Sequence, residues 1–166
     1  MRSQLLAGIL LGSLVLGSST HAQSAMTNSQ SVPTDFLHNY YEAYSPERAS
    51  QLRDFYAPDA TFTDPSFGLN LKGREEIGSL LERALAKYER LGHEILHSVT
   101  SGNELVVEGL MVARLNGKDL RVRYVSVFTF ANGKIATQRD LYDLLHYYEQ
   151  LGVVPSQFRP KPPPSH

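Results

Sequence analysis

Cysteine and tryptophan are both absent from the 166 residues of this chain. Without cysteine there is no disulfide framework, no thiolate metal site and no cysteine nucleophile. Neither positive nor negative charge is in excess, because the chain has 16 lysines and arginines and 17 aspartates and glutamates. A near-neutral chain lacks the basic surface with which proteins bind nucleic acid. The sequence also contains no phosphate loop, nucleophile elbow or dinucleotide fingerprint. We therefore expect no nucleic-acid partner and no cofactor.

Long apolar runs are also scarce, and the one that stands out covers residues 5–16. It is too short to cross a bilayer as a helix, Arg2 precedes it, and the small residues of Thr20-His21-Ala22 follow it. This order predicts a signal peptide over residues 1–22 with cleavage after Ala22; cleavage after Ala25, a membrane anchor and a buried helix are the alternatives. We expect an exported protein, periplasmic or secreted, without membrane contact after cleavage.

Composition divides the remainder of the chain into three parts. Residues 23–33 are polar and serine-rich, which predicts a flexible leader. Five of the nine prolines lie within residues 154–166, which predicts an extended, disordered tail or, alternatively, a ligand for a proline-reading groove. Residues 34–153 remain as one folded domain that is long enough for a hydrophobic core.

Helical periodicity dominates the first half of this domain. Thr34 is placed to cap a helix with aromatic residues at spacings of three and four, and Ser45-Pro46-Glu47 predicts the start of a second helix that ends at Pro58. A short strand over residues 60–64 follows. Residues 73–90 predict the longest helix, and Gly92 is its expected stop.

Alternating patterns dominate the second half. Residues 93–100, 104–115, 120–130 and 134–142 predict antiparallel strands with turns at Asn116-Gly117 and Asn132-Gly133, and residues 144–152 predict a closing helix. We expect an α+β fold in which a curved, mostly antiparallel sheet wraps around a long helix. Such a cone encloses an apolar internal pocket, because one helix does not fill it.

Three segments resemble nuclear transport factor 2-like domains, in particular the SnoaL-like and ketosteroid-isomerase-like branch. They are residues 55–65 (FYAPDATFTDP), residues 72–77 (KGREEI) and residues 133–143 (GKIATQRDLYD). The resemblance covers about residues 34–152 and implies the cone-shaped, cystatin-like fold. It does not define an activity, because this fold carries unrelated chemistries.

Asp64 is the first candidate for chemistry. It shares a strand face with Phe62, so an inward Phe62 places the carboxyl beside apolar walls, where its charged form is disfavoured. The resemblance to ketosteroid isomerase implies that Asp64 is a general base and that Tyr40, on the core-facing stripe of the first helix, holds an oxyanion. The isomerase's second oxyanion donor falls on Ser126, a weaker donor, which argues against steroid isomerisation. Alternatively, Asp64-Pro65 only opens a turn.

Asp140 is the second candidate. Residues 139–143 resemble the last strand of limonene epoxide hydrolase and of SnoaL-type polyketide cyclases, which implies a catalytic role for Asp140. The hydrolase also needs an Arg-x-Asp partner on an earlier strand, and Leu110-Met111-Val112 occupies that place here. Asp140 therefore remains as a lone acid or base, on one strand face with Gln138.

Other polar residues complete the expected pocket. His97 is either a core histidine or a second acid/base group, and we expect no metal site around it. Arg121 and Arg123 alternate with Tyr124, so they face away from the pocket, and Glu108 is expected to pair with one of them. The possible pocket residues beside the catalytic candidates are His97, Ser126, Phe62, Tyr124 and Gln138.

These patterns predict a protein with a pocket for a small apolar molecule. As an enzyme it would perform cofactor-free proton transfer, such as isomerisation, aldol-type cyclisation or dehydration, with Asp64 or Asp140 as base and Tyr40 as oxyanion donor. The alternative is a non-catalytic binder of a small hydrophobic ligand. In either case we expect a homodimer through the outer face of the sheet.

Overall fold

A six-stranded sheet organises residues 31–153, the part of the chain that the computed structural model describes. The strand order is β2-β1-β6-β5-β4-β3, and the pairing is antiparallel except between β1 and β6, which run parallel. The α+β fold with a curved, mostly antiparallel sheet is therefore confirmed. The predicted signal peptide, residues 23–30 of the predicted leader and the predicted tail lie outside the described residues.

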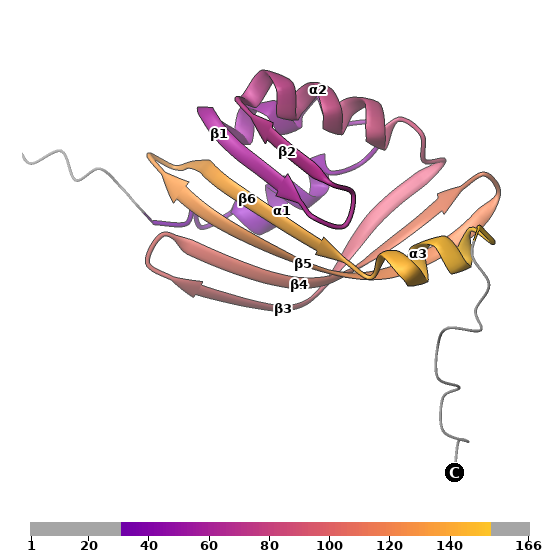
Figure 1. The fold of residues 1–166 in the computed structure, drawn as a ribbon. Helices are drawn as coiled ribbons and strands as arrows, with labels where there is room; N and C mark the ends of the chain where they lie inside the picture. The colour runs from indigo at the N-terminus through magenta and orange to yellow at the C-terminus, as the bar shows by residue number, and fades with distance from the viewer. Residues whose placement is uncertain (1–30, 154–166) are drawn as a thin grey trace, which may run out of the picture.

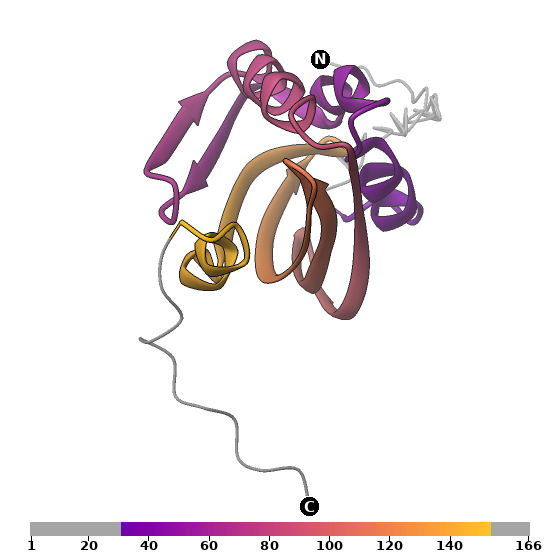
Figure 2. The ribbon, with the colours of Figure 1, turned by 90° about the vertical axis from the view of Figure 1, so that its right-hand side faces the viewer.

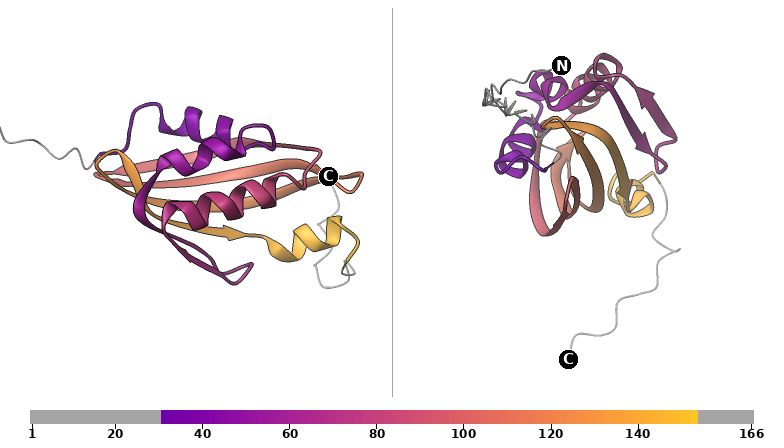
Figure 3. Two further views of the ribbon diagram at one scale, coloured as in Figure 1. Left: turned by 90° about the horizontal axis from the view of Figure 1, so that it is seen from above. Right: turned by 90° about the vertical axis from the view of Figure 1, so that its left-hand side faces the viewer.

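The helices are α1 (Phe36–Ala43), the 3-10 helix η1 (Ala49–Phe55), α2 (Arg74–Leu85) and α3 (Leu144–Gln150). The strands are β1 (Tyr56–Asp64), β2 (Leu69–Lys72), β3 (Arg90–Ser101), β4 (Glu104–Leu115), β5 (Lys118–Ala131) and β6 (Lys134–Tyr142). Figure 1 and the left view of Figure 3 show α1 and α2 on one face of the sheet, and Figure 2 shows the sheet curled beneath α2.

The core lies between these helices and the inner face of the sheet. In α1 the residues Phe36, Tyr40 and Ala43 are buried, which is the helical stripe expected from their spacing. The Phe36 ring stacks on Tyr40 at 5.0 Å and meets Phe128 and Phe130 of β5 edge-on at 5.2 and 4.7 Å. These contacts hold α1 against the middle of the sheet.

The two predicted asparagine-glycine turns are confirmed. Asn116 and Gly117 have φ angles of 53° and 73°, and Asn132 and Gly133 have φ angles of 52° and 72°. Two consecutive residues with positive φ define the hairpin turn that these residue types favour. The β4–β5 and β5–β6 connections are therefore specified locally by the sequence.

Several predicted boundaries are wrong. The residue before α1 is Asp35 rather than Thr34, and its side chain makes no capping bond. The second helix is a 3-10 helix that ends at Phe55, and Pro58 lies inside β1. Pro58 is tolerated there because the β1–β6 register shifts between Tyr56 and Thr61, so that no ladder bond is required of it.

The connection from α2 to the next strand also differs from the prediction. The helix ends at Leu85 and β3 already begins at Arg90, so Gly92 is a strand residue and not a helix stop. The short strand β2 was not predicted. It has four residues and pairs with β1 alone, and although Leu69-Asn70-Leu71-Lys72 alternates, so short a stretch does not stand out from a loop.

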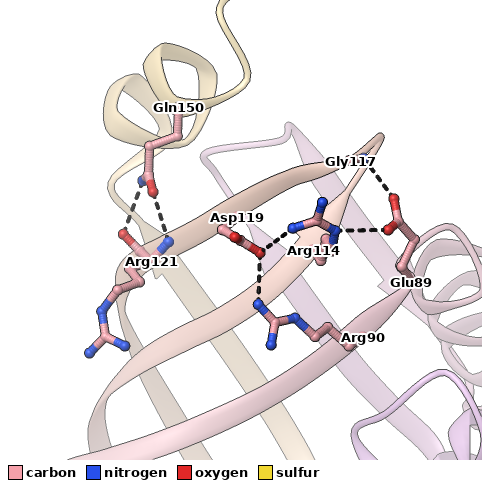
Figure 4. A network of polar contacts seen from close by, with 7 residues as sticks. All are labelled: Glu89, Arg90, Arg114, Gly117, Asp119, Arg121 and Gln150. Atoms are coloured by element: carbon pink, nitrogen blue, oxygen red, sulfur yellow. Dashed lines mark hydrogen bonds and ion pairs between the residues drawn. The ribbon is translucent and has the colours of Figure 1, made fainter.

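Helix α3 packs at the open end of the sheet. The Gln150 side chain accepts a hydrogen bond from the Arg121 amide at 2.8 Å and donates one to the Arg121 carbonyl at 3.0 Å (Figure 4). Close by, Asp119 accepts hydrogen bonds from Arg90 at 2.7 Å and Arg114 at 2.9 Å. These exposed pairs contribute little energy each, but together they tie β3 to the β4–β5 hairpin beside α3. Among residues 31–153, no helix is long and apolar enough to cross a membrane.

Candidate functional site

A cavity of about 370 Å³ lies between α2, the inner face of the sheet and α3. The predicted apolar stripe of α2 supplies one wall, with Leu81 and Leu85 among its residues, and Met111 of β4 lies in the wall as well. The polar part of the wall consists of Tyr44, Asp64, Lys87, Tyr88, Tyr142 and Tyr147. A cavity of this size and lining fits a small, mostly apolar molecule.

Asp64 supplies the carboxylate in this wall and also opens a turn. Its Oδ1 accepts hydrogen bonds from the backbone amides of Ser66 at 2.9 Å and Phe67 at 3.3 Å. Its side chain lies at the end of β1, and the residue is 3% exposed. Burial raises the pKa of Asp64, and the two backbone bonds oppose that rise. Asp64 therefore opens a turn and also lines the cavity, so the two interpretations from the sequence are compatible.

Asp140 lies deeper, on the inner face of β6. It is 1% exposed and faces Ser126 of β5 across the ladder. Gln138 donates its amide to both Asp140 carboxylate oxygens at 3.0 Å. Burial raises the pKa of Asp140 to about 7, although hydrogen bonds from Ser126 and Gln138 favour the charged form. A carboxyl that titrates near neutral pH is suited to general acid/base chemistry.

The wall in front of Asp140 is made by tyrosine. Tyr142 lies two residues along the same face of β6 and lines the cavity, as does Tyr44 from the end of α1. Both hydroxyls are electrostatically coupled to Asp140, and burial raises both of their pKa values well above the ordinary value. These hydroxyls therefore stay protonated and can donate hydrogen bonds in the cavity.

Tyr40 takes a different place from the one predicted. Its hydroxyl donates to Gln138 Oε1 at 3.0 Å, and the Tyr56 hydroxyl donates to the same oxygen at 2.6 Å. Because Gln138 in turn donates to Asp140, the two tyrosines orient the amide that holds this carboxylate. Among the described residues that line the cavity, Tyr40 is absent. The structure thus brings Tyr40 to Asp140 through Gln138, and not to Asp64 as an oxyanion partner.

Four of the five possible pocket residues lie inside the fold. Phe62 lines the cavity, and Ser126, Gln138 and Tyr124 are buried on the inner face of the sheet. His97 is the exception, because it is exposed on the outer face, opposite Glu108 of β4.

The prediction for His97 is wrong because of a β-bulge. The β3–β4 register shifts between Ile95 and His97, and one extra residue moves every later side chain to the opposite face. His93, before the bulge, faces inward opposite Met111 instead. Uninterrupted alternation predicts His93 and His97 on one face, so the pattern alone does not single out His93. Tyr44 and Tyr142 are not among the predicted site residues, although both lie on the predicted inner faces of their elements.

Comparison with known proteins places this geometry in a family context. Residues 37–138 match the family model of the SnoaL-like domain. No protein of curated function matches significantly. The similar solved structures share about a fifth of their residues with this chain, so they show the fold alone.

Three of these structures illustrate the range. A hypothetical protein with a ketosteroid isomerase-like fold from Catenulispora acidiphila, in complex with trimethylamine, has a TM-score of 0.67 and 21% identity over 78% of this chain and 99% of its own. A putative SnoaL-like polyketide cyclase from Shewanella denitrificans has a TM-score of 0.65 and 21% identity over 72% and 96%. An LEH-like epoxide hydrolase from M. tuberculosis has a TM-score of 0.58 and 18% identity over 69% and 85%.

Proposed function

The chain belongs to the SnoaL-like domain family of the nuclear transport factor 2-like superfamily, and on this premise we propose that it catalyses cofactor-free proton transfer on a small, mostly apolar molecule. One observation carries the proposal. Asp140, whose pKa burial raises to about 7, lies behind an apolar cavity whose wall contains a second buried carboxyl, Asp64. Paired carboxyls in such surroundings are characteristic of acid/base sites.

The cavity wall suggests how the roles are divided. Asp64 is the carboxyl that a ligand meets, so it takes the part of the base that removes a proton from a carbon next to a carbonyl. Negative charge then develops on the carbonyl oxygen, and the protonated hydroxyls of Tyr44 and Tyr142 donate hydrogen bonds to it. Asp140 is coupled electrostatically to Asp64 and to both tyrosines. Its protonation state therefore adjusts how readily Asp64 accepts and returns the proton.

The related folds support this reaction class over hydrolysis. One is described as a putative polyketide cyclase and another as an epoxide hydrolase. This chain has Leu110-Met111-Val112 where the hydrolase type would need its Arg-x-Asp partner, and Met111 lies in the cavity wall. Isomerisation, aldol-type cyclisation and dehydration need only a base and an oxyanion donor.

Deuterium exchange tests the proposal without knowledge of the substrate. The protein is incubated with acetophenone or cyclohexanone in D₂O between pH 5 and 9, and loss of the protons next to the carbonyl is followed by NMR. We expect Asp64→Asn to slow the catalysed exchange by about 10²-fold or more, and Asp140→Asn to remove an inflection near pH 7. Asp119→Asn, on an exposed carboxyl, is the control. Absence of catalysed exchange with both ketones at every pH contradicts the proposal.

A non-catalytic binder is the second candidate function. It is favoured by the hydrogen bonds that already occupy both carboxyls, since Asp64 accepts from a turn and Asp140 from Gln138. The related fold in complex with trimethylamine is a precedent for a small bound molecule. This function predicts that toluene binds with equal affinity to the wild type, Asp64→Asn and Asp140→Asn, with no exchange of ketone protons.

Two further parts of the proposal concern where the protein acts and with what partner. We propose export through residues 1–22, which is tested by fractionating expressing bacteria and sequencing the N-terminus of the product, expected at Gln23. We also propose a homodimer through the outer sheet face. Val99 of β3 and Val106 of β4 are register partners on this face and are 52% and 39% exposed, and an exposed apolar strand face of this kind commonly meets another protein surface.

Charged pairs frame this outer face. Arg121 bonds Glu94 at 3.1 Å and Arg123 bonds Glu108 at 2.5 Å. The expected pairing of Glu108 with an arginine of the neighbouring strand is confirmed. These pairs neutralise two arginines and two glutamates beside the apolar residues, which lowers the cost of covering this face with a second copy.

A further inference from the structure

Within residues 31–153, four buried polar atoms on the inner face of the sheet make no hydrogen bond of ordinary geometry, although the Tyr41 and Tyr124 hydroxyls lie near enough to interact with each other. The four atoms are both ring nitrogens of His93 and the hydroxyl oxygens of Tyr41 and Tyr124. The three rings touch, because the His93 centroid lies 5.0 Å from that of Tyr41 and 5.1 Å from that of Tyr124. Buried polar atoms are nearly always paired in folded proteins. Four unpaired atoms on three touching side chains therefore indicate a place where a ligand group or water completes the hydrogen bonds.

The fold brings this Tyr41–His93–Tyr124 cluster together by specific means. The bulge in β3 turns His93 inward, and α1 supplies Tyr41. Tyr124 of β5 lies directly across from Gly109 of β4, and a Cβ atom at Gly109 would overlap the Tyr124 ring. The glycine thus gives the tyrosine room to lie over the neighbouring strand.

The cluster adjoins the cavity. Tyr44 of the cavity wall meets the His93 ring edge-on at 5.0 Å, and Tyr142 of the wall lies 5.9 Å from the Tyr124 ring. Met111, also in the wall, is the register partner of His93. The cluster therefore lies directly behind the apolar cavity, with the Tyr44 and Tyr142 side chains between the two.

The charge state of the cluster selects the kind of group that it accepts. Burial lowers the pKa of His93 to about 4, so the imidazole is neutral at pH 7 and carries one donor and one acceptor nitrogen. Burial also raises the pKa values of Tyr41 and Tyr124, which keeps their hydroxyls protonated. The Asp140 charge is coupled to both hydroxyls and disfavours a second negative charge.

We infer that the Tyr41–His93–Tyr124 cluster binds an uncharged oxygen of the cavity's ligand, a carbonyl or a hydroxyl group, while the apolar cavity holds the remainder of that molecule. This inference rests on the proposed small-molecule function and specifies its ligand class. Ionised Asp140 repels a ligand carboxylate at this end, and a pure hydrocarbon leaves the four polar atoms without a partner.

Phenol and toluene test this inference, because they differ by a hydroxyl in place of a methyl group. Affinities are measured by NMR titration for the wild type, Tyr41→Phe and Tyr124→Phe. Each substitution is expected to weaken phenol about three- to tenfold, which is the loss of one hydrogen bond, and to change toluene affinity less than twofold. Tyr148→Phe, a tyrosine outside the cavity wall, is the matched control and should change neither.

A second readout covers variants that fail to fold. In the wild type, phenol should shift the His93 ring ¹⁵N resonances and toluene should not. The inference fails if toluene binds, phenol affinity is the same in the wild type, Tyr41→Phe and Tyr124→Phe, and phenol does not shift the His93 resonances. In that case the proposal that the cavity binds a small molecule still stands. If neither probe binds, the small-molecule function fails together with the inference.

Discussion

Gln138 donates its side-chain amide to both carboxylate oxygens of Asp140, and the orientation of that amide is set by two tyrosines. Its carbonyl oxygen accepts from the Tyr40 and Tyr56 hydroxyls, so the nitrogen must point toward Asp140. The hydrogen bonds from Ser126 and Gln138 favour an ionised Asp140, while burial disfavours it more strongly. The result is a carboxyl poised between its two states near neutral pH.

Asp140 should make protein stability depend on pH. Its folded pKa of about 7 is above its ordinary value of 3.8, so the folded state holds the proton more tightly and stability falls as pH rises from about 4 to 7. The loss is on the order of 4 kcal/mol. His93 acts in the opposite direction, because its pKa is lowered to about 4 from 6.5. The test is therefore the difference between wild type and Asp140→Asn in urea unfolding at each pH.

We expect wild type to lose stability relative to Asp140→Asn steadily between pH 4 and 7 and not above pH 8. Asp119→Asn is the control, since hydrogen bonds from Arg90 and Arg114 lower the pKa of this exposed carboxyl. Its stability difference from wild type should change only below about pH 4. A constant difference between wild type and Asp140→Asn across this range would show that Asp140 is not perturbed.

Gln138→Glu should raise the pKa of Asp140 further. The substitution places a second carboxyl where the amide now donates to Asp140, and two neighbouring carboxyls resist double ionisation. We expect the pair to titrate with one apparent pKa above 7 in a ¹³C NMR titration. Thr137→Glu adds the same charge on the exposed side of β6 and should leave Asp140 nearly unchanged. An equal response to both substitutions would contradict the role assigned to Gln138.

Tyr40→Phe and Tyr124→Phe should differ in their effect on stability. Both tyrosines are almost fully buried, but the Tyr40 hydroxyl is hydrogen-bonded to Gln138, whereas within residues 31–153 the Tyr124 hydroxyl makes no hydrogen bond of ordinary geometry and only a weaker interaction with the Tyr41 hydroxyl. Tyr40→Phe should lower the free energy of unfolding by about 1 kcal/mol, and Tyr124→Phe by much less or not at all. Thermal and urea unfolding of the two variants measure this. Equal losses would mean that Tyr124 is hydrogen-bonded within the protein.

Val99→Glu should dissociate the proposed dimer. Val99 is 52% exposed on β3, and a carboxylate there would have to be desolvated at an apolar interface. We expect light scattering to give twice the chain mass for wild type and the single mass for Val99→Glu. Val153→Glu changes an even more exposed valine, at 66%, beyond α3 and is the matched control. A wild type that is monomeric at 100 μM, or a dimer unaffected by Val99→Glu, rules out this face.

Local chemistry allowed much of the fold to be predicted. The bounds of β4 and β6 agree with the alternation of their residues, and the turns at Asn116-Gly117 and Asn132-Gly133 follow from residues that accept positive φ. The inward placement of Asp64 and Asp140 follows from the same period of two. The order of the elements predicted a curved sheet around a long helix, and resemblance to known domains added the cone-shaped, cystatin-like fold.

Other features arise from contacts between distant segments. The bulge that exposes His97 and buries His93 depends on pairing with β4, and β2 exists as a strand only because β1 pairs with it. Tyr40 and Gln138 are 98 positions apart, so no local pattern predicts that the Tyr40 hydroxyl donates its hydrogen bond to the Gln138 side chain.

By itself, the sequence determined the hydrophobic periods, the turns and the two inward carboxyls, because these depend on side chains within a few residues of one another. The tertiary structure decided which groups surround those carboxyls. The bulge in β3, the space above Gly109 and the Tyr40–Gln138–Asp140 chain all follow from strand register and packing. The structure also placed Asp64, Tyr44 and Tyr142 in the cavity wall with Asp140 nearby, where burial, hydrogen bonds and their mutual charges set their protonation states, and these depend on segments far apart in the chain.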